Sequence, residues 1–160
     1  IGIYEVEIDT TNKKDEAWYI NTNVTYSFGS EKVTGSYGSA TAKNYADIKW
    51  TQQEIDDEEA PEGADTNTVK SPGLKTKLIK NLKAEAGNIL SDTDWYATRK
   101  ADAGTSIPSS ITNHRAAVRT KCAEMETAIT NASNTAALET LYTRNDEGVR
   151  PLGDLPRLET

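Results

Sequence analysis

The chain has 160 residues, enough for one ordinary domain or two small units, and only 36% of them are hydrophobic. This lean composition favours an elongated protein, or one that completes its core against a partner. No run of residues is long and apolar enough for a membrane helix. The net charge of −7 argues against nucleic-acid binding, because phosphate contacts need clustered Lys and Arg.

Residues 1–50 predict a small β unit. Val6 and Ile8 alternate with acidic residues, so they are expected to share one face of a strand. Trp18 and Trp50 are expected to pack inside this unit, because large aromatic side chains are scarce in the chain. Four runs of β-forming residues predict three or four antiparallel strands: residues 4–9, 18–28, 31–37 and 45–50.

Residues 51–73 predict an acidic linker. Six carboxylates lie between positions 55 and 65, together with Pro61 and Gly63 and with very little apolar content. A Ca²⁺ site is the alternative interpretation, but the D-x-D-x-D-G spacing of a calcium loop is absent. We therefore interpret the segment as a solvated linker.

Residues 74–145 predict a helical module, followed by an extended tail over 146–160. Ser71 is expected to cap the first helix and Pro72 to suit its first turn. Its apolar stripe, which runs from position 74 to 90, is expected to pack against the stripe at 111–129 in a third helix. The fold class is therefore α+β: a small N-terminal antiparallel β unit, an acidic linker and a C-terminal helical hairpin with short extra helices.

Two further features complete the helical module. A short segment from Trp95 to Ala103 is expected to form the second helix and to end at Gly104, and Ser133 is expected to cap a short final helix. Trp95 is expected to anchor the second helix between the first and the third.

The sequence predicts no enzyme. His114 is the only histidine, and no nucleophile elbow or phosphate-binding loop accompanies it, so we interpret it as a helical residue that is exposed or partly buried. Cys122 is the only cysteine and is expected to be a buried small apolar residue. A Cys/His metal cluster is excluded, and no catalytic residue, metal ligand or cofactor site is expected.

Carboxylates and aromatic rings meet around residues 91–96, where Asp92 and Asp94 precede Trp95 and Tyr96. Paired carboxylates can cleave glycosidic bonds, but helix capping explains these two more simply. Asp92 is expected at the N-cap and Asp94 in the first turn, where negative charge favours the helix dipole. Trp95 and Tyr96 stay candidate interaction residues, and a glycan-binding surface stays open as one use of them.

A group of lysines lies on the first predicted helix. Lys80 and Lys83 share a face, and Lys77 lies one turn before them. Together with Lys75 they are interpreted as a solvated basic face. Docking onto an acidic partner surface, or onto the acidic linker of the chain itself, is the alternative, so Lys77, Lys80 and Lys83 are candidate interaction residues.

Two short patterns in the helical half carry a resemblance. The first is Leu90-Ser91-Asp92-Thr93-Asp94-Trp95, and the second is Arg115-Ala116-Ala117-Val118-Arg119 after a connection that contains Pro108. Over about residues 75–130 the chain resembles the C-terminal helical module of tailed-bacteriophage tail-fibre and tail-assembly-chaperone-like proteins. That family carries no fixed ligand site, so the resemblance implies no catalytic residue here.

The resemblance implies a non-enzymatic virion protein of the phage tail: a fibre-, baseplate- or adaptor-associated structural subunit that is assembled in the host cytoplasm. Its expected partners are other tail proteins, and it is expected to be an oligomer in the particle, with no nucleic acid, membrane or small-molecule ligand. The first alternative is an assembly chaperone that does not stay in the virion. The second is a small glycan-binding or glycan-cleaving module.

Overall fold

The computed structural model describes residues 4–29 and 31–158, and the chain divides into two compact units, 1–44 and 45–160. The first unit contains strands only, whereas the second combines helices with one short strand pair, among the described residues. The α+β class predicted from the sequence is therefore confirmed. The first unit ends six residues before the predicted limit at position 50, because residues 45–50 belong with the second unit.

The N-terminal unit contains two small sheets. Its strands are β1 (Glu5–Asp9), β2 (Tyr19–Ile20), β3 (Val24–Phe28), β4 (Lys32–Tyr37) and β5 (Thr41–Ala42). Strand β4 lies between β1 and β3 in one sheet, and β2 pairs with β5 in the other. Trp18 and Val33 are its buried hydrophobic residues, which confirms the expected position of Trp18.

The expectation of purely antiparallel strands is wrong for β1. Strand β1 pairs with β4 in parallel, whereas β3 and β4 form an antiparallel hairpin. The reason lies in the connection: the next strand along the chain, β2, pairs with β5, so β1 has no hairpin partner. It reaches β4 instead across residues 10–31, which is long enough for the crossover that a parallel pair needs.

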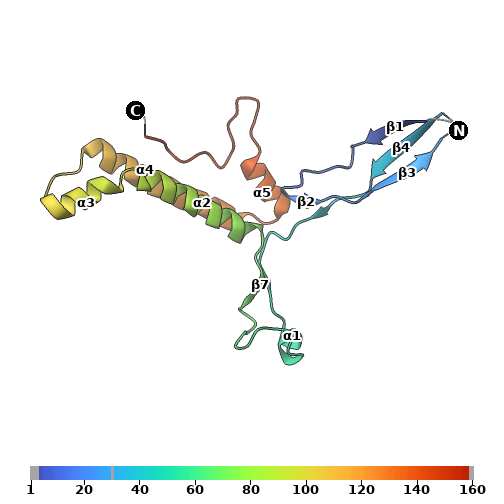
Figure 1. Cartoon of the computed structure of the whole chain (residues 1–160), viewed down its shortest axis with the longest axis horizontal. Coiled ribbons are helices and arrows are strands. Elements are labelled where there is room, and N and C mark those ends of the chain that lie inside the picture. Colours follow the sequence, from blue (N-terminus) through green and yellow to red (C-terminus); the bar gives the residue numbers. More distant parts are fainter. Residues whose placement is uncertain (1–3, 30, 159–160) are drawn as a thin grey trace. The chain divides into compact units, whose positions relative to one another are not determined.

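The C-terminal unit begins with an arm. Its elements are β6 (Ile48–Lys49), α1 (Gln52–Asp56), β7 (Val69–Ser71), α2 (Leu74–Ser91), α3 (Asp94–Ala103), α4 (Ser109–Asn131) and α5 (Thr135–Tyr142). Strands β6 and β7 pair antiparallel, and α1 lies in the segment that joins them (Figure 1). We call residues 48–71 the arm.

The structure of the arm corrects two predictions. Residues 51–73 are not an unstructured linker, because Thr51 and Glu54 form a complete capping box at α1 and Lys70 pairs with Glu54 across the arm. These local contacts satisfy polar groups and offset charge without an apolar core. Trp50 is only half-buried and lies in the arm rather than in the β unit, with the Lys70 ammonium 4.5 Å from its ring centre.

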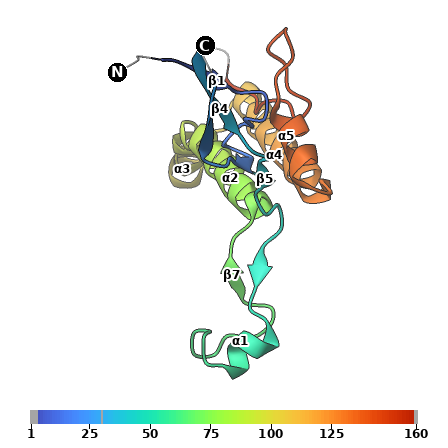
Figure 2. The ribbon, with the colours of Figure 1, turned by 90° about the vertical axis from the view of Figure 1, so that its right-hand side faces the viewer.

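Helices α2 and α4 pack side by side as a hairpin (Figures 1 and 2). Their buried residues come from the two predicted apolar stripes, so the predicted pairing of those stripes is confirmed: Leu82, Ala86, Ile111, Val118, Met125 and Ile129. Helix α5 adds Leu138, which is fully buried. The described part of the tail, 146–158, contains no helix or strand, but Leu152 and Leu155 are buried and Asp154 pairs with Arg144.

Helix α2 begins with a cap from outside the helix. Asp47 accepts hydrogen bonds from the Gly73 backbone N–H (2.7 Å) and the Thr76 hydroxyl (2.9 Å), and these bonds lower the pKa of its carboxyl. The predicted roles of Ser71 and Pro72 are wrong, because Ser71 ends β7 and the helix starts only at Leu74.

Candidate functional site

The corner between α2 and α3 is a tight two-residue link, Asp92 and Thr93. The Thr93 side chain is buried, and its hydroxyl and backbone N–H both donate to the Leu90 carbonyl, at 3.0 and 3.1 Å. Asp92 is in helical conformation as the C-cap of α2, so its predicted role as the N-cap of α3 is wrong. Helix α2 continues to Ser91, which leaves no room for an extended capping residue at position 92. Asp94 does lie in the first turn of α3, as predicted.

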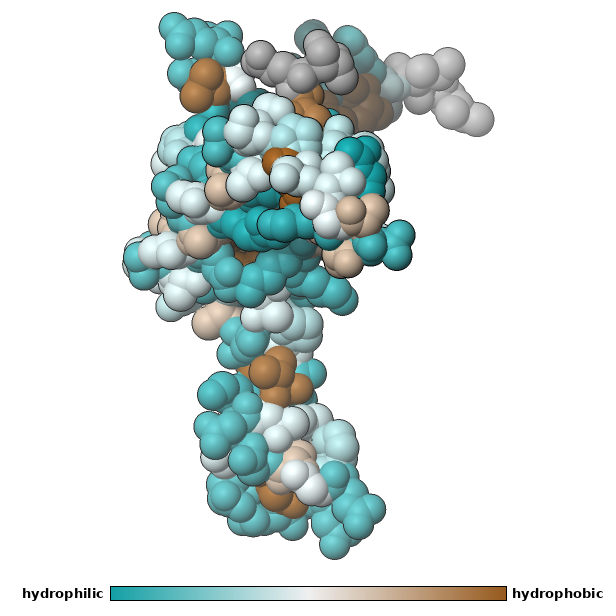
Figure 3. Space-filling view, turned by 90° about the vertical axis from the view of Figure 1, so that its left-hand side faces the viewer, coloured by the Kyte–Doolittle hydropathy of each residue, from teal (hydrophilic) through white to brown (hydrophobic). Residues whose placement is uncertain are grey.

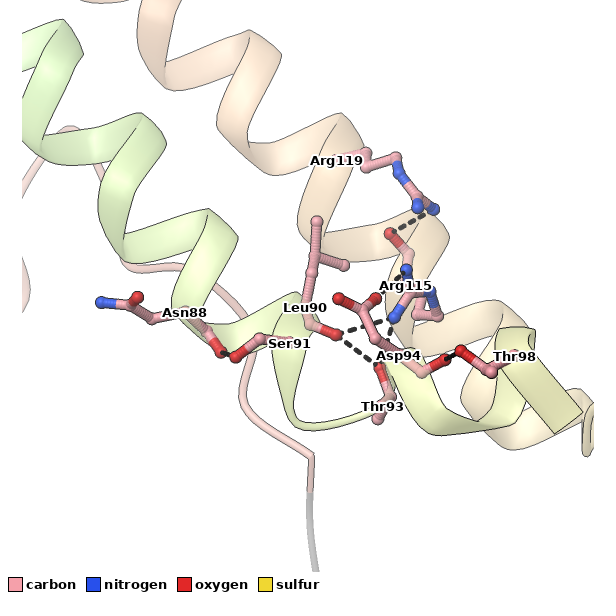
Figure 4. Close-up of polar contacts among 8 residues, drawn as sticks. All are labelled: Asn88, Leu90, Ser91, Thr93, Asp94, Thr98, Arg115 and Arg119. Atoms are coloured by element: carbon pink, nitrogen blue, oxygen red, sulfur yellow. Dashed lines mark hydrogen bonds and ion pairs between the residues drawn. The ribbon is translucent and has the colours of Figure 1, made fainter.

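Arg115 of α4 joins this corner to the opposite helix (Figure 4). Its Nη1 donates to the Leu90 carbonyl and to the Thr93 hydroxyl oxygen, both at 2.7 Å, and its Nη2 lies 2.8 Å from an Asp94 carboxylate oxygen. Only 13% of the Arg115 side chain is exposed. We call these contacts the Arg115 clamp.

The clamp has favourable electrostatics at both helix ends. The Leu90 carbonyl belongs to the last turn of α2, where a cation is stabilised by the helix dipole. Asp94 lies in the first turn of α3, where an anion is favoured. A planar guanidinium can serve several acceptors at fixed angles, which a lysine ammonium on its flexible stem does less well.

The clamp joins residues of two separate sequence patterns, Leu90–Trp95 and Arg115–Arg119. Leu90, Thr93 and Asp94 come from the first pattern and Arg115 from the second, so residues about twenty positions apart meet in one corner. Sequence reasoning named Arg115 in the second pattern but did not predict its contact with the corner, because nothing local to α4 indicates a distant partner. Arg119, one turn later in the same pattern, makes only a 3.5 Å bond to the Arg115 carbonyl.

Trp95 lies on the outside of the corner. Half of it is exposed, and α3 buries none of its described residues, so the prediction that Trp95 anchors α3 between α2 and α4 is wrong. The Arg115 clamp fixes the corner instead, and the indole is not needed in the core. The Tyr96 ring centre lies 3.9 Å from that of Trp95, and the Arg99 guanidinium lies 5.3 Å from the Trp95 ring. We call Trp95, Tyr96 and Arg99 the aromatic shelf.

A cavity of about 430 Å³ adjoins the shelf. Its polar lining residues include Asp92, His114 and Arg157, and Ile89 and Ile111 line its apolar part. His114 is partly buried, as predicted. The cavity combines apolar surface with hydrogen-bonding groups, a composition suited to binding. Within residues 4–29 and 31–158, no three His, Cys, Asp or Glu side chains are placed to hold a metal ion.

Cys122 lies outside this site, beside α2. It is only partly buried, so the predicted full burial is wrong. Burial, followed by the nearby Glu126 carboxylate, raises the pKa of the thiol, which disfavours the reactive thiolate.

The candidate lysines do not join the aromatic shelf. Lys77 and Lys80 are exposed near the start of α2, whereas Lys83 forms a 2.7 Å ion pair with Glu126 of α4. Lys75 donates to the Thr130 carbonyl and lies over the Tyr45 ring. At about 1.5 Å per residue, Lys80 is roughly 20 Å along the helix axis from the corner. The predicted interaction residues therefore fall into two separate places.

The surface on the α3 side of the molecule is mostly hydrophilic, with isolated hydrophobic residues (Figure 3). Among the described residues, no helix combines the length and apolarity required to cross a bilayer. Comparison of the chain with protein-family models, with curated proteins and with solved structures gives no match.

Proposed function

We propose that the protein is a non-enzymatic structural subunit of a bacteriophage tail, associated with the fibre, the baseplate or an adaptor, and that it acts through protein–protein contacts. The observation that carries this proposal is the half-exposed Trp95 on a corner held by the Arg115 clamp. The aromatic shelf is the surface that another tail protein binds.

The composition of the shelf supports a protein partner. Trp, Tyr and Arg are the residues most enriched among those that dominate binding energy at protein interfaces, and the shelf contains one of each. The clamp also lowers the cost of binding, because a corner that is already ordered loses less conformational entropy when a partner docks. The resemblance of residues 75–130 to phage tail modules supplies the biological context.

Mass spectrometry of purified particles of the encoding phage tests the proposal. The chain should be present in stoichiometric proportion to other tail proteins. Its absence from finished particles, together with its presence in assembly intermediates, would favour the assembly chaperone instead. Absence from both would reject the tail role.

A glycan-binding module is the second candidate, favoured by the cavity that places Trp95 near Asp92, His114 and Arg157. Sugars stack on aromatic rings and hydrogen-bond to such polar groups. A glycan array with the wild-type protein tests binding, and turnover assays with Asp92→Asn and Asp94→Asn test cleavage. A wild-type protein that neither binds nor cleaves any glycan would dismiss this candidate.

A further inference from the structure

We infer that the sheet formed by β1, β4 and β3 associates face to face with the same sheet of a second copy of this chain. The inference goes beyond the proposed function and does not depend on a phage role, because it rests on the N-terminal unit alone.

The register places apolar residues of all three strands on one side of this sheet. Two rows cross it: Val6 with Val33 and Phe28, and Ile8 with Gly35 and Tyr26. We call this side, which also includes Val24, the apolar face. The row between them and the row after the second one point to the opposite side, and they are polar: Glu7 with Thr34 and Ser27, and Asp9 with Ser36 and Thr25.

The apolar face is uncovered at its outer strands. Val33 of the central strand is only 8% exposed, but Val6 is 55%, Ile8 42%, Tyr26 56% and Phe28 83% exposed. Covering such a face stabilises a sheet, because apolar surface is removed from water. Among the described residues, the second sheet of the N-terminal unit, β2 with β5, does not pack extensively on this face.

Gly35 lets the neighbouring apolar side chains meet at the centre of this face. A Cβ at position 35 would lie 2.7–2.9 Å from side-chain carbons of Ile8, Val24 and Tyr26. These three side chains therefore close over the glycine. The result is a broad apolar surface, the shape that packs against another sheet at a spacing of about 10 Å.

The absence of charge on the apolar face is compatible with a second copy as its occupant. None of the residues of the apolar face carries a charge, whereas the opposite side pairs Glu7 with Lys32. The first unit, residues 1–44, holds six acidic and four basic side chains, a net charge of −2, so two copies of this unit repel each other weakly. The uncharged face is where this repulsion is smallest, and a two-fold axis would bring the same patch of both copies together.

The area of the face also fits a dimer. A fully buried aromatic side chain removes about 150–250 Å² from water. The two aromatic and two aliphatic residues of this face are partly exposed, and together they offer roughly 500 Å² of apolar surface. A standard interface buries about 800 Å² per partner, of which rather more than half is apolar. The apolar face with a polar rim is therefore of the size that a stable dimer needs.

The first test measures the mass of the full chain by sedimentation equilibrium over a range of concentrations. The wild type should form a dimer, and Phe28→Thr should raise its dissociation constant by roughly 30-fold, the effect of removing an aromatic anchor. Ser27→Thr, one residue away on the opposite side, should leave the constant unchanged. A wild type that stays monomeric at every concentration would overturn the inference.

Site-directed cross-linking keeps the test decisive if Phe28→Thr fails to fold. In a Cys122→Ser background, Phe28→Cys should give a disulfide-linked dimer on mild oxidation, whereas Ser27→Cys should remain largely monomeric. Equal cross-linking from both positions would contradict face-to-face association.

Discussion

The Arg115 guanidinium donates a 2.7 Å hydrogen bond to the Thr93 hydroxyl oxygen, and through it α4 fixes the corner between α2 and α3. The same nitrogen also donates to the Leu90 carbonyl, and the second terminal nitrogen pairs with Asp94. One side chain therefore orders three consecutive elements. The position of Trp95, the first residue after Asp94, follows from this contact.

Arg115→Ala should destabilise the helical unit by about 3 kcal/mol, because hydrogen bonds to charged groups contribute about 1.5–3 kcal/mol each. The buried Thr93 hydroxyl oxygen would also lose the donor that it has in Arg115. Arg119→Ala is the matched control and should cost less than about 0.5 kcal/mol, since Arg119 makes a single weak contact. Urea unfolding monitored by circular dichroism measures both. Equal losses in the two variants would show that the clamp does not stabilise the corner.

Trp95→Ala should change the free energy of unfolding by less than about 1 kcal/mol, because half of the residue is already exposed. A buried tryptophan anchor would cost about 3–5 kcal/mol, and Trp18, which is 8% exposed, should show a loss of that order within its own unit. Denaturant titrations of both variants make the comparison. A loss of several kcal/mol at position 95 would mean that the indole packs in the core.

Replacement by alanine should change the free energy of unfolding in opposite directions at two glycines of α2: Gly73 just before the helix and Gly87 inside it. A Cβ at position 73 would lie 2.3 Å from the carbonyl carbon and oxygen of Ala46, so Gly73→Ala forces the backbone apart and should reduce stability. Gly87 has open space around its Cβ position, and Gly87→Ala should stabilise the helix by up to about 1 kcal/mol. Thermal unfolding of the two variants tests this pair, and shifts of the same sign would contradict the packing at Gly73.

The Glu54 carboxyl should titrate far below its usual range. Lys70, followed by the Thr51 backbone N–H and hydroxyl, lowers the pKa of Glu54 from 4.5 to about 2. Because the folded arm favours the ionised carboxylate, this contribution to stability is fully present above the unfolded pKa near 4.5 and is lost as the pH falls through about 2.

An NMR titration of the Glu54 side-chain carboxyl measures this value directly. Lys70→Gln removes the largest cause and should bring the pKa back toward the usual range, while Lys49→Gln, in the same arm, serves as a control. A wild-type midpoint near 4.5 would show that the contact between Glu54 and Lys70 does not persist in solution.

The helical spacing of apolar residues predicts the two helices that bury a continuous apolar stripe, α2 and α4. The helices α2 and α4 and their mutual packing follow from apolar residues at spacings of three and four, which few other structures satisfy. The Arg115 clamp could not be predicted in this way, because Arg115 and Thr93 lie 22 positions apart and neither belongs to an apolar stripe. Polar contacts between elements depend on how those elements are placed.

Acidic composition gave a misleading prediction for the arm. The six carboxylates within residues 55–65 are exposed, as a solvated segment requires, but Glu54 just before them completes the capping box of α1 and pairs with Lys70. The prediction for Trp95 is also wrong. A large indole in a chain with few apolar residues suggests a core anchor, but Trp95 is half-exposed, and its neighbour Asp94 connects α3 to Arg115. An exposed aromatic residue cannot be distinguished from a buried one by composition alone.

The amount of this chain in purified phage particles, measured by quantitative mass spectrometry for the wild type and for Trp95→Ala, tests the central claim most directly. The account predicts that the wild type is present in stoichiometric amount and that the folded Trp95→Ala chain is largely lost from the particles. Incorporation of Trp95→Ala at the wild-type level would contradict the claim that the aromatic shelf binds a tail protein.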